Sequence, residues 1–598
     1  MSSGGAGLVD LVEVNKSHVP QLTAVDSEEG TSFDEKQVAV DGEAVSVSDS
    51  DISYEDLKSL RRVAGKIPWT SYTIAFVEFC ERFSYYGTTT VFVNFIQRPL
   101  PDGSTTGAGH EGQSGALDMG QRASTGLTTF NSFWSYIMPL LGAYIADQYL
   151  GRFKTIQWSI AVALVGHTVL IISAIPPVIQ HPSGAIACFS IGLVIMGVGT
   201  GGFKSNISPL IAEQYTETKM KVTTTKKGER VITDPTATYA RIFMWFYFMI
   251  NCGSLVGQIG MVYAEKYVGF WLSYLLPTIM FCLCPMVLYA CKKHYTLKKP
   301  TGSVLAKAVK LWSLAMKPCW SWNPATTIRN ARSPEFWQRV KPSHMQTKPE
   351  WMTFDDAWVD EVRRGFKACT VFLWYPVFWL AYNQMNNNLT SQAATMELHG
   401  VPNDLINNLN PLSLIIFIPI CDRFIYPALR KAHIRFTPLK RITGGFFMGV
   451  CAMTCACVTQ VYIYRMSPCG NQANDCETPA PINVWVQTLP YVFIAFGEIF
   501  ASITGLEYAF TKAPRNMRSL VTAVYLFMTA LSSAVGQALV ALSEDPLLVW
   551  NYGVVAVLAF IAGFAFWFTH RKQDAMEDEL NMLPESDFTG RDVADEEK

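Results

Sequence analysis

The chain has 598 residues, of which 49% are hydrophobic and 16% are charged. Soluble domains usually carry about 25% charged residues, so this composition is typical of a membrane protein. The net charge of −1 argues against nucleic acid as a partner. The sequence shows no zinc-spaced cysteine pair, phosphate-binding glycine loop or nucleophile elbow, so we expect no enzyme, metal or cofactor.

Both ends of the chain are polar and acidic. Residues 1–65 are rich in Ser, Gly, Asp and Glu and lack periodicity, which predicts a disordered tail, and residues 571–598 form a second tail. Because no cleavable signal peptide precedes the apolar region, the first membrane helix is expected to act as its own signal.

Between the tails, apolar runs long enough to cross a bilayer as helices follow one another. They predict an all-α membrane protein with twelve transmembrane helices, divided into six-helix bundles at 71–291 and 367–570 by a connection at 292–366. The runs lie at about 71–97, 124–147, 155–176, 185–211, 239–263, 270–291, 367–391, 405–429, 440–464, 484–511, 519–542 and 549–570.

The distribution of Lys and Arg predicts the orientation. An even number of helices places both tails on one side, and basic connections lie on the cytoplasmic side of a membrane. The basic connections are 148–154, 219–230, 292–366, 430–441 and 512–518. Both tails are therefore expected in the cytoplasm.

The central connection, residues 292–366, holds 14 Lys or Arg against 6 Asp or Glu and has Trp-rich patches. Two interpretations have equal support. The segment is either a set of amphipathic pieces on the cytoplasmic membrane surface or a solvated basic linker.

The two halves resemble each other where helices two and eight end. Asp147 with Arg152 closes helix two, and Asp422 with Arg423 closes helix eight. An acid and a base at equivalent cytoplasmic ends are expected of two six-helix repeats. We interpret these pairs as gating or structural latches between helices and not as substrate contacts.

One connection on the opposite side, residues 465–483, contains Cys469 and Cys476 with six residues between them. Because this loop is expected to face an oxidising compartment, the pair is predicted to form a disulfide.

The first apolar run carries three charges, Glu78, Glu81 and Arg82. On a helix, Glu78 and Arg82 are i and i+4 and lie on one face. Charges inside a membrane are costly and do not face lipid. They form either a buried structural ion pair or a proton or substrate site in a water-filled cavity.

Other polar groups lie inside the expected helices. Lys204 in helix four and Glu498 in helix ten are opposite charges in opposite halves, which favours a functional site. Asn251 and Asn410 could equally be hydrogen-bonding glue between helices. Several aromatic residues are candidates for either packing or pocket roles, namely Tyr85, Tyr86, Tyr136, Trp379 and Tyr525.

These motifs resemble one known family. The segment from Glu78 to Gly87, E-x-x-E-R-F-x-Y-Y-G, is similar to the signature of the proton-dependent oligopeptide transporters of the major facilitator superfamily. Residues 246–255, 142–155 and 504–508 resemble further family segments, and 382–388 looks like the fungal branch. The resemblance covers helices one to eleven and not the tails.

The resemblance implies a symporter that imports di- and tripeptides with protons by alternating access. Glu78, Glu81 and Arg82 match the proton-coupling motif. Lys204, with Arg82, matches the receptor for the peptide carboxylate, and Glu498 matches the acid that receives the amino group. The remaining substrate-binding matches are Asn251 and Asn410 for the peptide backbone and Tyr85, Tyr86, Tyr136, Trp379 and Tyr525 as pocket aromatics.

Three positions depart from many relatives. Thr89 replaces an arginine, Asn383 replaces a helix-seven acid, and Tyr525 replaces a pocket Trp. The family's ion pair between the helix-four lysine and helix seven therefore cannot form, and the gating partner of Lys204 stays open. The alternatives to peptide import are transport of nitrate or another small anion, and a nutrient receptor. We expect the plasma membrane as the location and regulatory partners for the tails.

Overall fold

A computed structural model describes residues 60–575, with gaps inside that range. The gaps are 61, 64, 111, 218–219, 225–227, 234, 299, 301–303, 332, 334, 346–348, 350, 426–427, 430–431, 433–435, 477, 506–507 and 509–517. The expected tails therefore fall almost entirely outside the described residues.

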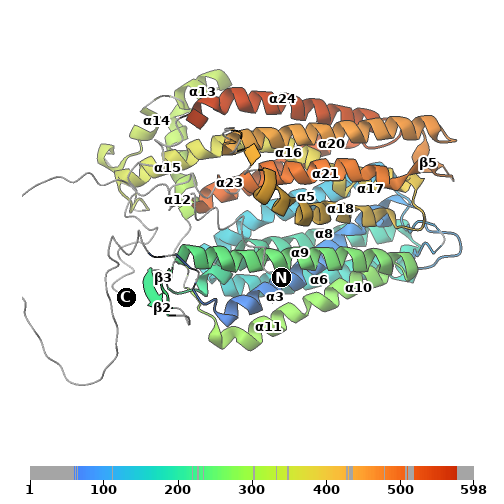
Figure 1. Cartoon of the computed structure of the whole chain (residues 1–598), viewed down its shortest axis with the longest axis horizontal. Helices are drawn as coiled ribbons and strands as arrows, with labels where there is room; N and C mark the ends of the chain where they lie inside the picture. The colour runs from blue at the N-terminus through green and yellow to red at the C-terminus, as the bar shows by residue number, and fades with distance from the viewer. Residues whose placement is uncertain are drawn as a thin grey trace, which may run out of the picture.

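Long helices run side by side along the longest axis of the molecule (Figure 1). The first half of the bundle contains α3 (Trp69–Thr90), α4 (Phe92–Gln97), α5 (Gly120–Ile145), α6 (Arg152–Ala174), α8 (Pro182–Glu213), α9 (Pro235–Tyr267), α10 (Phe270–Phe281) and α11 (Leu283–Cys291). The second half contains α16 (Tyr375–Asn383), α17 (Asn388–Ala394), α18 (Leu409–Ile420), α20 (Pro438–Met466), α21 (Thr488–Gly497), α23 (Arg518–Ala538) and α24 (Leu548–Ala575).

Local sequence explains where several helices begin and end. Pro182 and Pro438 are the first residues of α8 and α20, where the missing N–H of proline costs no hydrogen bond. Gly269, with φ of 128°, separates α9 from α10, and a Cβ there would lie 2.5 Å from Thr106. Only glycine fits this sharp turn without strain.

Helical structure occupies each of the twelve expected runs within the described residues. Seven helices among the described residues are by themselves long and apolar enough to span a membrane. The other five runs are shorter, interrupted or more polar, because pocket-facing groups and breaks occur within them. The all-α membrane fold predicted from the sequence is confirmed.

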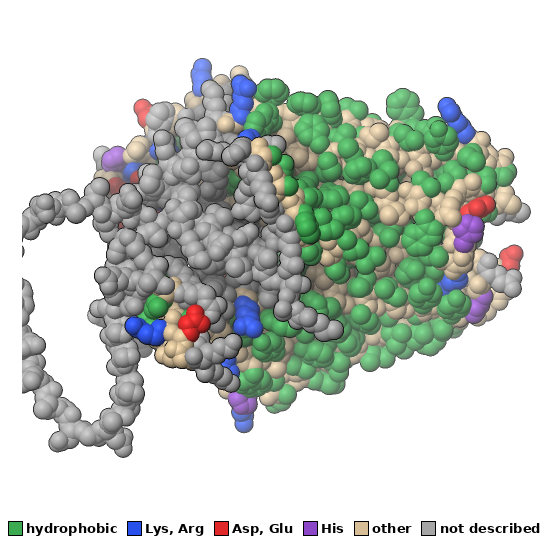
Figure 2. All heavy atoms as spheres, in the orientation of Figure 1, with side chains coloured by type: hydrophobic (Ala, Val, Ile, Leu, Met, Phe, Trp, Pro, Cys, Tyr) green, Lys and Arg blue, Asp and Glu red, His purple; other side chains and the backbone are tan. Residues whose placement is uncertain are grey.

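An apolar belt surrounds the bundle on the face shown in Figure 2, with charged side chains gathered towards the two ends. Large hydrophobic side chains of the membrane helices are exposed, including Trp158 at 67%, Ile191 at 57% and Phe568 at 59%. In water such a surface would be unstable, whereas lipid tails cover it at no cost.

In the part of the chain that the structure describes, three π-helical segments interrupt the regular helices. Segment η2 (Ala146–Leu150) follows α5, and η9 (Cys421–Ile425) follows α18. They contain Asp147 and Asp422, the two acids expected at equivalent positions. The third, η12 (Glu498–Ile503), begins at Glu498. π-Helical turns are rare and often mark functional sites.

Residues between the halves form a small helical unit with its own core. Its helices are α12 (Val304–Met316), α13 (Pro324–Ala331), α14 (Glu335–Gln338) and α15 (Asp356–Cys369). Trp358, Val359 and Val362 are fully buried in this core, and Val524 of α23 packs against it. The expected boundary at 366/367 falls inside α15. Trp320 and Trp322 are largely exposed, at 77% and 102%, so contact with the membrane surface stays a prediction.

The described residues form two small sheets, which lie at opposite ends of the bundle. Near the linker unit, β3 (Arg230–Thr233) pairs with β2 (Lys221–Thr224) and, in parallel, with β1 (Arg62–Val63). At the far end, β4 (Met396–Glu397) pairs in parallel with β5 (Ala480–Asn483), which Figure 1 places opposite the linker unit.

Hydrogen bonds join the two halves at this far end. Among them, Ser391 donates to Gln97 at 2.5 Å, and Lys266 donates to the carbonyl of Gly400 at 2.8 Å. Gln121 also donates to Asn388 at 3.2 Å. The far end is therefore closed in this conformation.

Candidate functional site

The charged motif of α3 forms a compact, buried triad. Arg82 Nε lies 3.0 Å from Glu78 Oε1 and 2.5 Å from Glu81 Oε2. Each of the three residues is at most 3% exposed. One guanidinium therefore serves two carboxylates, and the triad carries a net negative charge when both acids are ionised.

Close packing of α9 against α3 buries this triad. A Cβ at Gly253 would lie 2.5 Å from the carbonyl oxygen of Phe79, and one at Gly257 would lie 2.4 Å from that of Phe83. Glycine at both positions lets the two backbones approach, as in other closely packed membrane helices.

Two tyrosines extend the triad along α3. The Arg82 guanidinium carbon lies 5.6 Å from the ring centre of Tyr85 and 5.8 Å from that of Tyr86, so both rings contribute cation–π attraction. The Tyr85 hydroxyl donates to Ser135 at 3.2 Å, which fixes that ring against α5.

Lys204 of α8 joins the same region. Its Nζ lies 3.9 Å from the ring centre of Tyr136 in α5, and it is close enough to Glu78, Glu81 and Arg82 to interact electrostatically. In this conformation the neighbours of Lys204 are thus the aromatic face of Tyr136 and the acidic triad, all in the first half.

In the second half, Glu498 stands at the start of η12, where the helix widens. Asn410 of α18 donates its Nδ2 hydrogen to Glu498 Oε2 at 3.2 Å, and Asn410 is 3% exposed. The Tyr382 side chain is also within hydrogen-bonding reach of the Glu498 carboxylate.

Tyrosines from both halves lie near Glu498. Each is close enough to its carboxylate for an electrostatic interaction, so side chains of both halves converge on one region. They are Tyr86, Tyr136 and Tyr247 from the first half and Tyr382 and Tyr525 from the second.

Sequence reasoning missed two of these five tyrosines, Tyr247 and Tyr382. Tyr247 precedes Asn251 by four residues on one helix, so it shares a face with a predicted binding residue. Tyr382 follows Trp379 by three residues, and the two rings meet edge to face at 5.2 Å. These spacings could have identified both.

Other predicted pocket residues make contacts that stabilise the protein. Asn251 donates to the backbone oxygen of Tyr247 at 2.9 Å, and the Tyr525 hydroxyl donates to the backbone oxygen of Ser502 at 3.0 Å. Trp379 is buried, with 8% of its surface exposed, and its indole N–H has no partner among the described residues. That N–H remains available to a ligand.

Asn383, which stands where many relatives have an acid, lines a different space. It borders a cavity of about 20 Å³ together with Asn387, Thr125 and Ser532. This volume suits about one water molecule, and most of the lining residues carry polar side chains.

The expected latch at the linker end includes a further acid. Arg152 lies 3.9 Å from Asp147 and also pairs directly with Glu213 at the end of α8. Glu213, which sequence reasoning missed, thus ties three helices together through Arg152. Asp422 and Arg423 lie in η9, but their side chains are outside what the structure describes.

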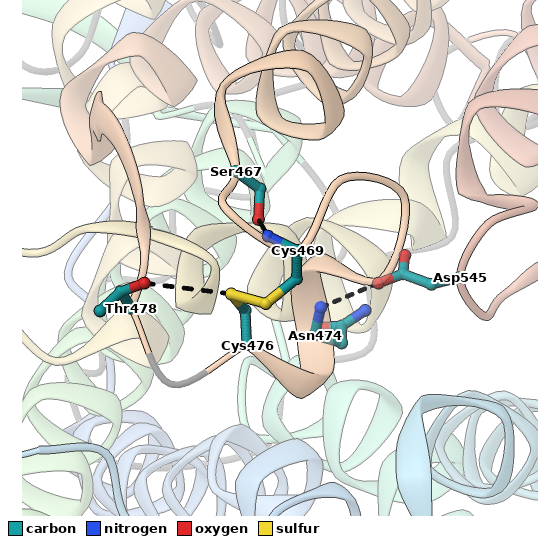
Figure 3. Close-up of a disulfide and its surroundings, with 6 residues drawn as sticks. All are labelled: Ser467, Cys469, Asn474, Cys476, Thr478 and Asp545. Carbon is teal, nitrogen blue, oxygen red and sulfur yellow. Dashed lines mark hydrogen bonds between the residues drawn. A yellow bond between two sulfur atoms is a disulfide. The ribbon is translucent and has the colours of Figure 1, made fainter.

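The predicted disulfide between Cys469 and Cys476 is present, with Cα atoms 5.8 Å apart. Figure 3 shows it in a loop that also contacts the turn before α24, where the Asn474 N–H donates to Asp545 at 2.8 Å. The Cys469 N–H donates to the Ser467 hydroxyl at 3.3 Å.

Comparison with known proteins identifies the family. A model of the POT family matches residues 153–555. The chain belongs to the POT family. The resemblance to this family that the α3 motif and the other sequence motifs indicated is therefore confirmed. Relatives in this family are named as transporters and not as enzymes.

POT relatives from fungi align over most of the chain. Peptide transporter PTR_B of Candidozyma auris is 41% identical and covers 88% of this chain and 87% of its own. The probable peptide transporter ptr2 of Schizosaccharomyces pombe is 42% identical, covering 88% and 82%. Peptide transporter PTR2 of Saccharomyces cerevisiae is 39% identical, covering 88% and 83%.

Solved POT structures share the fold. The in meso crystal structure of the POT family transporter PepTSo superposes with a TM-score of 0.67 at 19% identity, covering 86% of this chain and 100% of that one. An auto-inhibited POT family peptide transporter gives 0.65 at 21% identity, covering 84% and 97%. The helical bundle described above is thus the fold of POT transporters.

Proposed function

We propose that this protein is a proton-coupled symporter that carries di- and tripeptides across a membrane. The observation that carries the proposal is one site built from both halves, with Arg82 and Lys204 on one side and Glu498 on the other. A zwitterionic peptide has a carboxylate and an ammonium group at its two ends, and this charge arrangement complements both. The names of the fungal relatives support the same substrate class.

The anchors address groups that every peptide shares. Arg82 and Lys204 receive the carboxylate, while Glu498, held by Asn410, receives the amino group. Asn251, Trp379 and the tyrosines line the space between these ends. Because side chains lie between the anchors, recognition of the main chain leaves side-chain specificity broad.

The triad on α3 supplies the coupling to protons. When one of Glu78 and Glu81 binds a proton, the remaining carboxylate and Arg82 are neutral together, and Arg82 can turn to a peptide carboxylate. Each proton that enters down a membrane potential of 100 mV contributes roughly 2.3 kcal/mol, which drives uptake against a gradient.

Two alternative functions are less well supported. Nitrate or another small anion would fit Arg82 and Lys204, but the carboxylate of Glu498 would repel it. A nutrient receptor needs no protonatable triad in its pocket. The partly buried carboxylate of Glu498 favours a cationic group at this position over a small anion.

The closed far end supports an orientation and a mechanism. With the basic linker unit in the cytoplasm, both tails are cytoplasmic, the far end is extracellular, and the described conformation is closed to the outside. Transport then proceeds by rocking the bundles at 71–291 and 367–570 about the site. The plasma membrane is the proposed location, and the tails are the proposed sites for regulatory partners.

Flux into proteoliposomes tests this proposal. A labelled dipeptide should accumulate when an inward proton gradient is imposed and should equilibrate without accumulation when the gradient is absent. Labelled nitrate in the same vesicles should show no gradient-driven uptake. Accumulation of nitrate but not dipeptide would overturn the assignment, and binding without flux of either would indicate a receptor.

A further inference from the structure

A second set of buried ionisable groups lies at the far end, away from the proposed transport site. Asn94 in α4 donates both hydrogens of its amide, one to Glu265 Oε1 and one to Asn403 Oδ1, each at 2.9 Å. Asn403 returns a hydrogen bond to Asn94 Oδ1, also at 2.9 Å. Because Asn403 belongs to η8 (Asn403–Asn408) of the second half, this network connects the two halves.

Asp404, the next residue in η8, completes the network from the second half. Its carboxyl group is within hydrogen-bonding reach of Glu265 in α9. Asp404 is 0% exposed and Glu265 is 2% exposed. Two carboxyl groups from opposite halves are thus buried against each other.

Three oxygens of this pair have no donor among the described residues. They are Glu265 Oε2 and both carboxylate oxygens of Asp404. An ionised carboxylate can only accept hydrogen bonds, so two ionised groups here would repel each other and leave buried acceptors unsatisfied. A proton bound between them turns one group into a donor to the other, as in other buried carboxyl pairs.

The surroundings hold one facing cation and several hydroxyls. Arg98, the residue after α4, interacts electrostatically with Asp404, Asp475 and Asp545. Among the described residues, its side chain makes no ion pair with Asp404 within 4 Å. Tyr491 uses its hydroxyl on Asn407 at 2.6 Å. Groups that also face the pair are Ser114 and Tyr274.

These surroundings favour the protonated form of the pair. Burial raises the pKa of Asp404 to about 8, although the contact with Glu265 and the positive charge of Arg98 act in the opposite direction. Asp404 precedes the apolar part of its helix, so it comes within reach of external water when the halves separate.

We propose that Glu265 and Asp404 bind one proton between them, taken from the external medium, and that this proton holds the far end closed. When the halves part at this end, both carboxyl groups become hydrated and ionise, and the proton returns to the same side. This proton is not transported. The Glu265–Asp404 pair is a second protonation site, separate from the α3 triad, and it makes the opening of the far end respond to external pH.

The sign of the effect follows from proton binding. The closed far end binds one proton more than the open far end, so acid favours closure and alkali favours opening. Between the ordinary carboxyl pKa of the open form, about 4, and the raised pKa of the pair in the closed form, the ratio of closed to open molecules should fall about ten-fold for each unit of pH. That slope is the signature of one proton.

A distance measurement across the far end tests the proposal. Fluorophores are attached through genetically encoded ketone side chains at Thr105 in the first half and Asn471 in the second, so the native cysteines stay intact. In peptide-free protein in lipid nanodiscs, raising the pH from about 6 to about 9 should convert short distances into long ones. A wild-type distance that does not change with pH would overturn the proposal.

The variant Glu265→Gln carries the decisive comparison. Its amide donates a hydrogen bond to Asp404 at every pH, so the far end should stay closed. The change in the ratio of closed to open molecules between about pH 6 and 9 should be at least ten-fold smaller than in the wild type. Glu544→Gln is the matched control, because the exposed Arg122–Glu544 pair also joins the halves, at 3.5 Å, and is weakly held. Its response should equal that of the wild type. An unchanged response in Glu265→Gln, or a lost one in Glu544→Gln, would contradict the proposal.

Two further measurements separate this site from the transport site. The infrared band of a protonated carboxylic acid at pH 7 should weaken equally in Glu265→Gln and in Asp404→Asn, which covers the case that one variant fails to fold. The pH response of the distance should persist in Glu78→Gln. A response that disappears in Glu78→Gln but persists in Glu265→Gln would place the sensor in the triad and overturn the inference.

Discussion

Arg82 is shared by Glu78 and Glu81, and this sharing defines what a proton can do at the site. Glu78 lies one helical turn from Arg82, at 3.0 Å, whereas Glu81 is its sequence neighbour, at 2.5 Å. A peptide carboxylate that approaches Arg82 competes with both. In the proposed mechanism, protonation of one acid frees the guanidinium, so substrate binding and proton binding should favour each other.

Glu78→Gln should therefore uncouple transport. The variant keeps a neutral side chain at residue 78, so peptide still binds and the loaded protein still changes conformation. It should exchange internal for external peptide but fail to accumulate peptide when a proton gradient is imposed. Counterflow and gradient-driven uptake in the same proteoliposomes measure the two activities.

Glu81→Gln is the companion variant for this prediction. If Glu78→Gln still concentrates peptide under a pH gradient while Glu81→Gln does not, coupling resides at Glu81. If both variants accumulate peptide normally, the triad is a structural ion pair.

Glu498→Gln should discriminate between peptides with and without a free amino group. It removes the charged partner of the ammonium but keeps an acceptor for Asn410. The loss for free dipeptides should be about ten- to a hundred-fold in affinity, corresponding to roughly 1.5–3 kcal/mol for a charge-assisted hydrogen bond. Binding of N-acetylated dipeptides should change little, and competition binding measures both.

A matched control for this prediction is Tyr525→Phe. Its hydroxyl is bonded to the Ser502 carbonyl, so the variant should affect free and acetylated peptides alike. If Glu498→Gln also weakens both ligands equally, Glu498 is not the amino-group partner.

At the scale of elements, apolar runs were enough to locate the helices, because the bilayer fixes their length. The breaks within them could not be predicted in the same way. The π-helical segment at Glu498 and the split between α16 and α17 depend on contacts between helices, which hydropathy does not record. Glu213 was missed for the same reason, since its partner Arg152 lies 61 residues earlier.

The disulfide loop is an element whose contribution can be measured. Loss of a link that closes so short a loop should lower stability by about 2.5 kcal/mol on the chain-entropy model. Cys469→Ser should therefore reduce the melting temperature, while flux per folded molecule is retained because the loop lies outside the proposed site. Thermal unfolding by intrinsic fluorescence measures the change.

Cys476→Ser serves as the control for the disulfide prediction. Both variants remove the same link, so they should have equal effects, and the double variant should be no worse than either. A loss of flux without a loss of stability would indicate that the loop acts in transport.

At the scale of the whole molecule, the basic linker unit and the closed far end define an axis across the membrane. The proposed orientation predicts that Trp322→Cys is labelled by an impermeant maleimide only after cells are permeabilised. Asn471→Cys, in the disulfide loop at the opposite end, should be labelled in intact cells. The reverse pattern would invert the orientation, and mass spectrometry of labelled peptides distinguishes the two.

The packing of the linker unit has a mechanical consequence. The unit rests on α23, whereas Thr296 is held to the first half by reciprocal hydrogen bonds with Gln214 at 3.1 and 3.2 Å. Seven residues of chain, 297–303, separate Thr296 from the start of α12 at Val304, and seven residues of any conformation span at most about 25 Å. So short a connection keeps the two bundles at a high effective concentration, so their association is an intramolecular reaction. The two bundles thus resemble the subunits of a dimer that are joined by one short covalent connection. A cut within 297–303 should leave two fragments that still copurify.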